Sequence, residues 1–256
     1  MYRYLPLLGF LFLTVVCTPV LGNSYSFISK MGGVFPSSNT ALVMSWRSES
    51  EQFSKLNEQL DKDFLKWGLS KKMVKNIFYR SHQQLFFKYR QFSLAQDTFS
   101  TGAYDCVSGS LVLAGLLDYY GFDYVIRETT YHVFLEVKVG NDPIFLEVTD
   151  PIVGFISDRE EQKAYIEKYK RGENVSNQWT YYTKPKNAEP TIIYRTINLK
   201  NLIGLQYFNQ AIKNYNDKND LVAYQFSVTA LKIYDAERIR EFSDFLKQNL
   251  LLSASR

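Results

Sequence analysis

Cysteine and histidine are scarce in this chain of 256 residues, which contains two of each. The cysteines are Cys17 and Cys106, and the histidines are His82 and His132. If the segment that carries Cys17 is removed, one thiol remains, and a single thiol cannot form an internal disulfide. Two distant histidines and one cysteine also lack the spacing of zinc ligands, so we expect no metal site and no cofactor.

Long apolar runs are missing as well. The run at residues 7–16 follows the basic residue Arg3 and is shorter than the roughly 20 apolar residues that a membrane-spanning helix needs. With small residues ending at Gly22, these features are typical of a signal peptide over residues 1–22. We therefore expect a mature chain that is periplasmic or secreted and has no integral membrane segment. Lipid attachment at Cys17 is less favoured, because the residues before it are a poor acceptor context.

A bias toward one charge is also absent. The formal net charge is +4, and basic and acidic residues alternate along the chain without a basic stripe that aromatic residues interrupt. We therefore do not expect nucleic acid as a partner. Aromatic residues are abundant, with 19 Tyr and 19 Phe, so enough apolar surface is available for a dense core.

Hydrophobic periodicity predicts an α+β fold. Residues 23–48 carry Gly, Ser and Pro, and we expect them to be irregular or extended. The predicted helices are 50–67, 70 through 89, 106–120, 157–170, and a helical region from 198 almost to the end. The predicted strands are 124–127, 132–139 and 144–149, with a hairpin turn at Gly140 and a polar loop at 96–104. Helix stops are expected at Gly68, Gly121 and Gly172, and helix caps at Ser70 and at Ser157 with Glu160.

One cysteine, one histidine and one acidic residue occur along the chain in an order that is typical of thiol enzymes. Cys106 opens a predicted helix, His132 opens a predicted strand, and Glu147 lies on the next strand. This is the order of a thiol nucleophile, its base and the acid that orients the base. Taken alone, Cys106 would more often be a small buried hydrophobe. The three residues together favour a catalytic triad. His82 lies in a polar stretch and is expected at the surface.

The acid of the triad is predicted from the register of the two strands. On residues 132–139 the apolar side chains are the odd positions, and on 144–149 they are the even positions. Paired strands bury their apolar faces on the same side, so Glu147 shares a face with His132. Asp150 falls on the opposite face and stays in reserve, because it precedes Pro151 and can already have left the ladder.

This arrangement resembles the transglutaminase-like superfamily, whose members have a papain-like thiol fold. The resemblance covers about residues 70–155, and its specific part runs from Cys106 to Thr149. It implies a nucleophile-bearing helix packed on an antiparallel sheet. The function it implies is acyl transfer or hydrolysis at protein or peptide amide bonds, with catalytic residues Cys106, His132 and Glu147. The sequence departs from the family pattern in having Glu147 where Asp is usual. It also has Phe134 or Val107 where Trp is frequent.

Several parts of the mechanism stay open at this stage. The backbone N–H of Cys106 is one candidate donor to an oxyanion, and Gln91 and Tyr89 are weak candidates for the second. The acyl acceptor can be water or an amine, with water as the default. The leading alternative is an inactive transglutaminase-like fold that binds peptide or cell-envelope material.

The predicted domains are a transglutaminase-like domain over residues 23–198 and a helical extension over 199–256. In the extension, the small residues Ala223 and Ala230 resemble the second helix of a tetratricopeptide unit. One unit cannot form the concave surface of a repeat array. We therefore expect a helical pair packed on the main domain, with partner contact through these helices as a further possibility.

Overall fold

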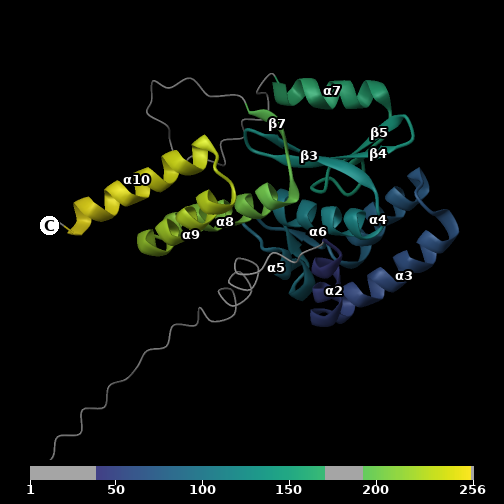
Figure 1. The fold of residues 1–256 in the computed structure, drawn as a ribbon, viewed down its shortest axis with the longest axis horizontal. Coiled ribbons are helices and arrows are strands. Elements are labelled where there is room, and N and C mark those ends of the chain that lie inside the picture. The colour runs from purple at the N-terminus through teal and green to yellow at the C-terminus, as the bar shows by residue number, and fades with distance from the viewer. Residues whose placement is uncertain (1–38, 171–192, 255–256) are drawn as a thin grey trace, which may run out of the picture. The chain divides into compact units, whose positions relative to one another are not determined.

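A computed structural model of the chain describes residues 39–170 and 193–254 (Figure 1). Its helices are α2 (Asn39–Glu49), α3 (Glu51–Trp67), α4 (Lys71–Gln84), α5 (Ala95–Ser100), α6 (Cys106–Tyr119), α7 (Arg159–Lys170), α8 (Leu199–Asn216), α9 (Asp220–Ile233) and α10 (Glu237–Ala254). Its strands are β1 (Lys88–Tyr89), β2 (Ala103–Tyr104), β3 (Asp123–Thr129), β4 (Val133–Val139), β5 (Asp142–Leu146), β6 (Phe155–Ile156) and β7 (Tyr194–Ile197). The predicted signal peptide and the predicted helix stop at Gly172 lie outside the described residues.

The main sheet has five antiparallel strands in the order β6-β5-β4-β3-β7. Its central hairpin pairs β4 with β5, and Gly140 turns the chain between them with a φ of 64°. A positive φ is easily adopted by glycine, which has no Cβ. Helices around one antiparallel sheet confirm the predicted α+β class.

The register of the β4–β5 hairpin agrees with the one predicted from the apolar pattern. Leu135 lies opposite Leu146, and Val137 lies opposite Ile144, so these four residues share one buried face. The other face carries the even positions of β4 and the odd positions of β5. His132 and Glu147 lie just outside the strand ends, since β4 begins at Val133 and β5 ends at Leu146.

Helices cover both faces of the sheet. Helix α6 packs on the face that carries Ile126 of β3 with Leu135 and Val137 of β4, and α7 lies over the other face (Figure 1). Two glycines let α6 approach its neighbours closely, as its small residues predicted. A Cβ on Gly109 would lie 2.7 Å from the Val148 side chain, and one on Gly115 would lie 2.6 Å from Trp46.

Caps explain several helix boundaries. The Ser50 side chain accepts from the Phe53 amide at the start of α3, and Ser70 accepts from Met73 at the start of α4. Helix α3 ends before Gly68, as predicted. Helix α4 ends at Gln84 rather than continuing to residue 89, because the chain turns there and enters β1.

Three further local predictions are wrong. Residues 39–49 are helical, and Val43 and Trp46 are fully buried, so tertiary packing decides this segment rather than its weak pattern. Helix α5 occupies part of the predicted polar loop and is too short to show periodicity. The first amides of α7 are capped by Asp158, whose carboxylate accepts from Glu160 and Glu161, and not by Ser157.

The C-terminal helices pack against the rest of the described chain. Helix α8 contacts α6, and a Cβ on Gly204 of α8 would lie 2.5 Å from the Tyr234 side chain. Gln210 of α8 donates to the backbone oxygen of Phe92 at 2.8 Å. These contacts place the helical pair on the main body, as expected. None of the helices in residues 39–170 and 193–254 combines the length and apolar character needed to cross a membrane.

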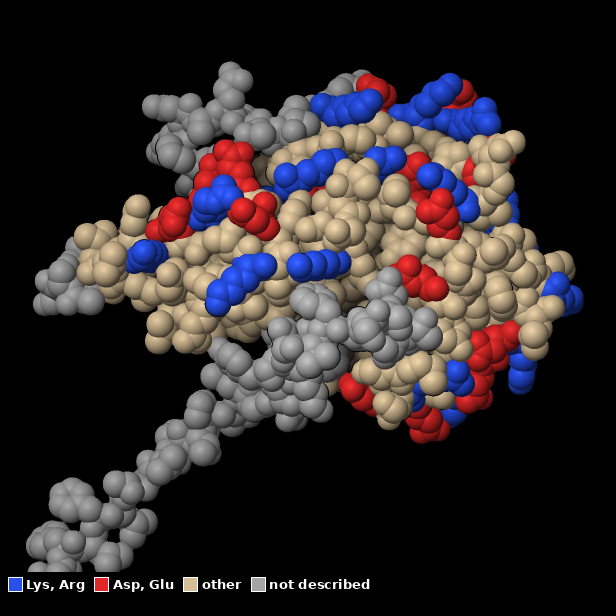
Figure 2. Space-filling model, in the orientation of Figure 1, with Lys and Arg blue, Asp and Glu red and all other residues tan. Residues whose placement is uncertain are grey.

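Figure 2 shows basic and acidic side chains mixed on one face of the molecule. Helix α7 shows the same mixture on its outer side, where Glu160, Glu161, Lys163 and Lys168 are exposed. Its inner side carries the half-buried residues Tyr165, Ile166 and Tyr169. Helix α7 is therefore amphipathic, and its aromatic side faces the sheet.

Candidate active site

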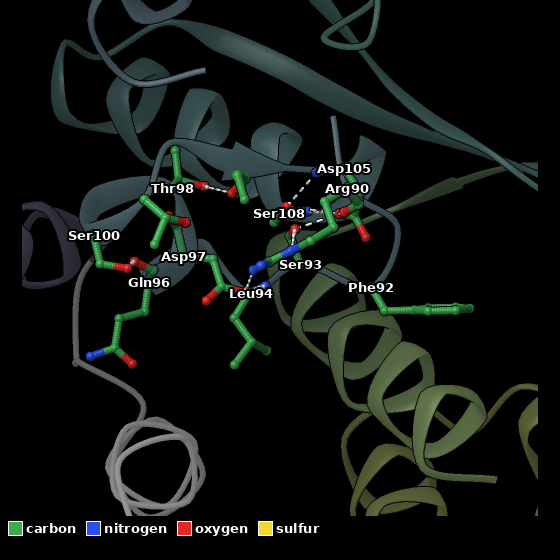
Figure 3. Close-up of polar contacts among 12 residues, drawn as sticks. Arg90, Phe92, Ser93, Leu94, Gln96, Asp97, Thr98, Ser100, Asp105 and Ser108 are labelled. Atoms are coloured by element: carbon green, nitrogen blue, oxygen red, sulfur yellow. Dashed lines mark hydrogen bonds and ion pairs between the residues drawn. The ribbon is translucent and has the colours of Figure 1, made fainter. Parts of the chain in front are cut away.

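Cys106 is the first residue of α6, and it is partly accessible. The residue before it, Asp105, caps the helix. Its carboxylate accepts from the Ser108 amide at 2.8 Å and from the Ser108 hydroxyl at 2.7 Å, while the Asp105 amide donates back to that hydroxyl (Figure 3). The amides of the first turn of a helix have no acceptor within the helix. The thiol therefore sits at the positive end of the helix dipole, beside backbone amides that can donate to an anion.

The Asp105 cap is itself buried and tied to a neighbouring loop. Burial raises the pKa of Asp105 to about 6, although hydrogen bonds from Ser108, Val107 and Phe92 counteract the rise. Phe92 has a φ of 63°, which is uncommon for a residue other than glycine. The loop beside the nucleophile is thus held in one conformation from two sides, by Asp105 and by Gln210 of α8.

His132 lies in the tight turn between β3 and β4. The Thr129 amide and hydroxyl both donate to the His132 backbone oxygen, at 2.8 Å and 3.1 Å. Arg238 of α10 donates to the Thr130 backbone oxygen at 2.9 Å. The turn that carries the histidine is therefore fixed within the sheet and also by a C-terminal helix.

Glu147 immediately follows β5, and its carboxylate is buried. One oxygen, Oε2, contacts Nε2 of His132 and accepts from the Tyr165 hydroxyl. The other, Oε1, accepts from the Thr149 amide at 2.8 Å and the Thr149 hydroxyl at 2.6 Å. Both oxygens are therefore fully engaged, which fixes the orientation of the carboxylate.

His132 lies between the thiol and the acid. Nε2 faces Glu147, and the side chain of Cys106 lies close enough to the imidazole to act on its charge. Burial alone would lower the pKa of His132, but the charge of Glu147 and the hydrogen bonds with Cys106 and Glu147 raise it well above its ordinary value. Burial alone would raise the pKa of Glu147, but the charge and hydrogen bond of His132, with Thr149 and Tyr165, lower it to about 2. The His132 ring thus lies between a thiol and a carboxylate, in surroundings that favour its protonated form.

Asp150 has a different role in the structure. Its carboxylate accepts from the amides of Ile152 and Val153, at 3.1 Å and 2.9 Å, and so caps its own turn. The contact to His132 is made by Glu147 instead. The geometry therefore agrees with the choice of Glu147 from the strand register.

Aromatic residues surround this group, and among them Tyr169 was not singled out by the sequence. The Tyr169 ring stacks on the His132 ring, with centroids 5.6 Å apart and planes 5° apart. Tyr89 is half exposed and lies within electrostatic range of Cys106. Burial and the neighbouring negative charges raise its pKa, so its hydroxyl stays protonated. Gln91, the other weak candidate for an oxyanion donor, is half-buried.

The prediction that His82 lies at the surface is wrong. Its ring is buried against Phe78, Phe86 and Tyr104, and neither ring nitrogen has a hydrogen-bond partner among the described residues. Burial lowers the pKa of His82 to about 4, although the charges of Asp150 and Glu147 act in the opposite direction. The polar neighbours of His82 in sequence hid the apolar face of α4 on which it lies.

Metal ligation finds no support in the part of the chain that the structure describes, where no cluster of three His, Cys, Asp or Glu residues could hold a metal ion. Comparison of the chain with protein-family models, with curated proteins and with solved structures found no significant match in any of the three.

Proposed function

We propose that this protein is an exported thiol enzyme with a transglutaminase-like, papain-like fold. Its reaction is acyl transfer or hydrolysis at protein or peptide amide bonds. The observation that carries the proposal is the position of His132, which faces the Glu147 carboxylate and lies within electrostatic range of the Cys106 side chain. This arrangement supports the roles of nucleophile, base and orienting group, with the nucleophile at the start of a helix.

The proposed chemistry follows from this geometry. The Cys106 thiolate attacks the amide carbon, and the carbonyl oxygen becomes an oxyanion. The Cys106 amide is one donor to that oxygen, and the Tyr89 hydroxyl is the candidate for the second. The C–N bond then breaks, the amine leaves with a proton from the His132 imidazolium, and the acyl group remains on the sulfur as a thioester.

The second half of the reaction uses the same residues. Neutral His132 accepts a proton from the incoming acceptor as that acceptor attacks the thioester carbonyl. The sulfur leaves as the thiolate beside the His132 imidazolium, and Glu147 holds the imidazole in the orientation that both steps need. Water as acceptor gives hydrolysis, whereas a lysine amine gives a crosslink. Water is the default, because it is always available to a partly accessible thiol.

The first prediction concerns the reactivity of Cys106. Because an adjacent imidazolium favours the thiolate, iodoacetamide should alkylate Cys106 quickly at pH 6 to 7, and His132→Ala should slow that reaction by about tenfold or more. The measurement is the rate of carbamidomethylation of the Cys106 peptide by mass spectrometry, which separates it from Cys17. His82→Phe is the matched control, because it removes the other histidine and should leave the rate within about twofold.

Two outcomes would count against the proposal. If the His132→Ala variant reacts as fast as the wild type, the thiol and the imidazole are not coupled. If Cys106 in the wild type reacts no faster at pH 6 to 7 than a simple thiol, the alternative of an inactive fold that binds peptide or cell-envelope material is favoured. Cys106→Ser should keep the fold, because the exchanged atom is small and partly accessible.

A further inference from the structure

Helix α7 places two tyrosines on the proposed acid and base. Tyr165 and Tyr169 are four residues apart and therefore lie on the same side of the helix. The Tyr165 hydroxyl donates to Glu147, and the Tyr169 ring stacks on His132. The two hydroxyls also lie 3.3 Å from each other. One side of α7 thus contacts both Glu147 and His132, the proposed acid and base.

The aromatic packing behind these contacts fixes where α7 lies. The ring of Tyr165 packs edge-on against Phe134 of β4 at a centroid distance of 5.0 Å, and it also contacts Phe145 of β5. Tyr169 contacts Phe134 as well. Phe134 and Phe145 are buried and belong to the same strands that lead to His132 and Glu147. This packing therefore places the Tyr165 hydroxyl at the Glu147 carboxylate. Phe145, which contacts the Tyr165 ring, lies on β5, the strand that immediately precedes Glu147.

We propose, building on the thiol-enzyme function above, that Tyr165 is a positioning residue that holds Glu147 against His132, and that the Tyr169 ring holds the plane of the imidazole. Without Tyr165, Oε2 of Glu147 loses a donor, and the carboxylate can rotate away from Nε2. Without the Tyr169 ring, one face of the imidazole is open to water. The longer side chain of Glu, compared with Asp, has one more rotatable bond to restrain, and Tyr165 with Thr149 restrains it.

The alternative effect of the hydroxyl is purely electrostatic, and it has the opposite sign. A hydroxyl that donates to a carboxylate withdraws charge from it. If that were its whole effect, removal would strengthen the attraction of Glu147 for the imidazolium and raise the pKa of His132. If the hydroxyl positions the carboxylate, its removal weakens the contact and lowers the pKa of His132. The direction of the change separates the two effects.

Several titratable groups face this pair, and their charges must stay constant in the test. They are Cys106 from α6, Tyr165 and Tyr169 from α7, and Tyr89, Tyr104, His82 and Asp150 from the surrounding elements. Burial and the charge of Glu147 raise the pKa of Tyr165 well above 10, so it remains a donor at every pH of the experiment. Replacing Cys106 with Ala removes the thiol from the titration.

The experiment is an NMR titration of the histidine side chains in the Cys106→Ala background. The chain has only two histidines, so the two imidazole titration curves can be assigned with one His82→Phe sample. Tyr165→Phe should lower the pKa of His132 by about one unit, because it removes one hydrogen bond to a charged group. Tyr169→Leu should also lower it, whereas Tyr169→Phe, which keeps the ring, should restore most of the wild-type value.

The matched control is Tyr124→Phe. Tyr124 also donates its hydroxyl to a carboxylate, that of Asp118 at 2.8 Å, and this pair is not among the groups that face His132. This variant should lose comparable stability and leave the His132 titration unchanged. An unchanged or raised pKa of His132 in Tyr165→Phe would overturn the positioning role.

A second readout separates this inference from the proposed function. In the protein with Cys106 intact, Tyr165→Phe should slow alkylation at pH 6 by about tenfold relative to the wild type. If the wild-type thiol is reactive and depends on His132, but Tyr165→Phe changes neither rate nor titration, only the positioning role fails. If the wild-type thiol is inert, the proposed function fails, and the titration still decides whether Tyr165 holds the acid and base together.

Discussion

A glutamate in place of an aspartate is accommodated here by the position of the residue in the chain. Glu147 stands one residue beyond the end of β5, and its amide is held by a hydrogen bond to the Gly154 oxygen. Its longer side chain reaches His132, and the free rotation that the extra methylene adds is restricted by Thr149 and Tyr165. The longer side chain of Glu147 therefore still makes its contact with His132.

His82 leads to a prediction about acid stability. Its pKa is lowered by burial from 6.5 to about 4, so between these values the unfolded chain binds a proton that the native protein does not. Stability is therefore lost as the pH falls through this window, by about 3 kcal/mol for this residue. His82→Phe removes the titration and keeps an aromatic ring among Phe78, Phe86 and Tyr104. The free energy of unfolding of the variant, relative to wild type, should thus rise by about 3 kcal/mol between pH 7 and pH 4.

Urea unfolding at pH 7 and pH 4 measures the unfolding free energies of His82→Phe and wild type. Subtracting the wild-type value at each pH removes the contributions of the other titratable groups, which both proteins share. Among those, Asp105 acts in the opposite direction, since its raised pKa means that the native protein keeps a proton longer than the unfolded chain does. Tyr124→Phe serves as the control, because a tyrosine does not titrate in this range. A difference between His82→Phe and wild type that stays constant with pH would show that His82 is accessible to protons in the native state.

At the scale of elements, the loop after β5 is closed around a glycine. The Glu147 amide donates to the Gly154 oxygen at 2.8 Å, and the Gly154 amide donates to the Asp150 oxygen at 3.0 Å. A Cβ on Gly154 would lie 2.1 Å from the Glu147 backbone oxygen and 2.3 Å from that of Asp150. Backbone atoms cannot move aside as a flexible side chain can. The loop that positions the acid therefore requires glycine at this position.

Gly154→Ala should cost about 2 kcal/mol or more and displace Glu147 from His132, so that alkylation of Cys106 at pH 6 falls to the rate of His132→Ala. Thermal unfolding and the alkylation rate measure the two effects. Gly140→Ala is the control, because a Cβ there meets nothing within 4 Å but the φ is positive. It should cost about 1 kcal/mol and leave the thiol rate unchanged. Wild-type reactivity in a folded Gly154→Ala protein would mean that the loop adapts.

Local patterns were sufficient for much of this architecture. The alternation of apolar residues on β4 and β5 predicted their register, and the small residues of α6 predicted its close packing. Both features can be predicted from residues that are near one another in the sequence. Tyr165 was missed because it lies 18 residues after Glu147, on a helix whose sequence is dominated by charge. The contact of Tyr165 with Glu147 depends on which side of α7 faces the sheet, and the local sequence pattern of α7 does not predict that side. Helix α2 was missed for the same kind of reason, since its burial depends on α6.

At the scale of the whole described molecule, one buried carboxylate joins the sheet to the C-terminal helices. Glu128 of β3 is completely buried, and it accepts from Arg195 of β7 at 2.7 Å and from Arg238 of α10 at 2.5 Å. It also accepts from the Tyr234 hydroxyl, just after α9. Arg238 in addition holds the turn before His132 through Thr130. The helices after residue 198 are therefore tied to the sheet and to the candidate site.

This connection predicts that the described sheet and the C-terminal helices unfold together. Glu128→Gln removes the buried counter-charge of the half-buried Arg238 and the exposed Arg195, which should cost about 3 kcal/mol. Hydrogen exchange, followed by mass spectrometry on peptides from α6 and from α9–α10, reads the two parts separately. Under conditions where exchange requires global opening, both sets of peptides should accelerate by the same factor, on the order of a hundredfold or more.

Glu136→Gln is the matched control. Glu136 pairs with Arg127 at 2.6 Å within the sheet. Since this pair is partly exposed, its loss should cost only about 1 kcal/mol and accelerate both regions slightly. If Glu128→Gln accelerates α9–α10 alone and leaves α6 at its wild-type rate, the C-terminal helices are an independent module. Equal acceleration means instead that they are part of the cooperative unit that positions His132, so that substitutions as distant as α10 reach the thiol through Arg238 and the turn at Thr130.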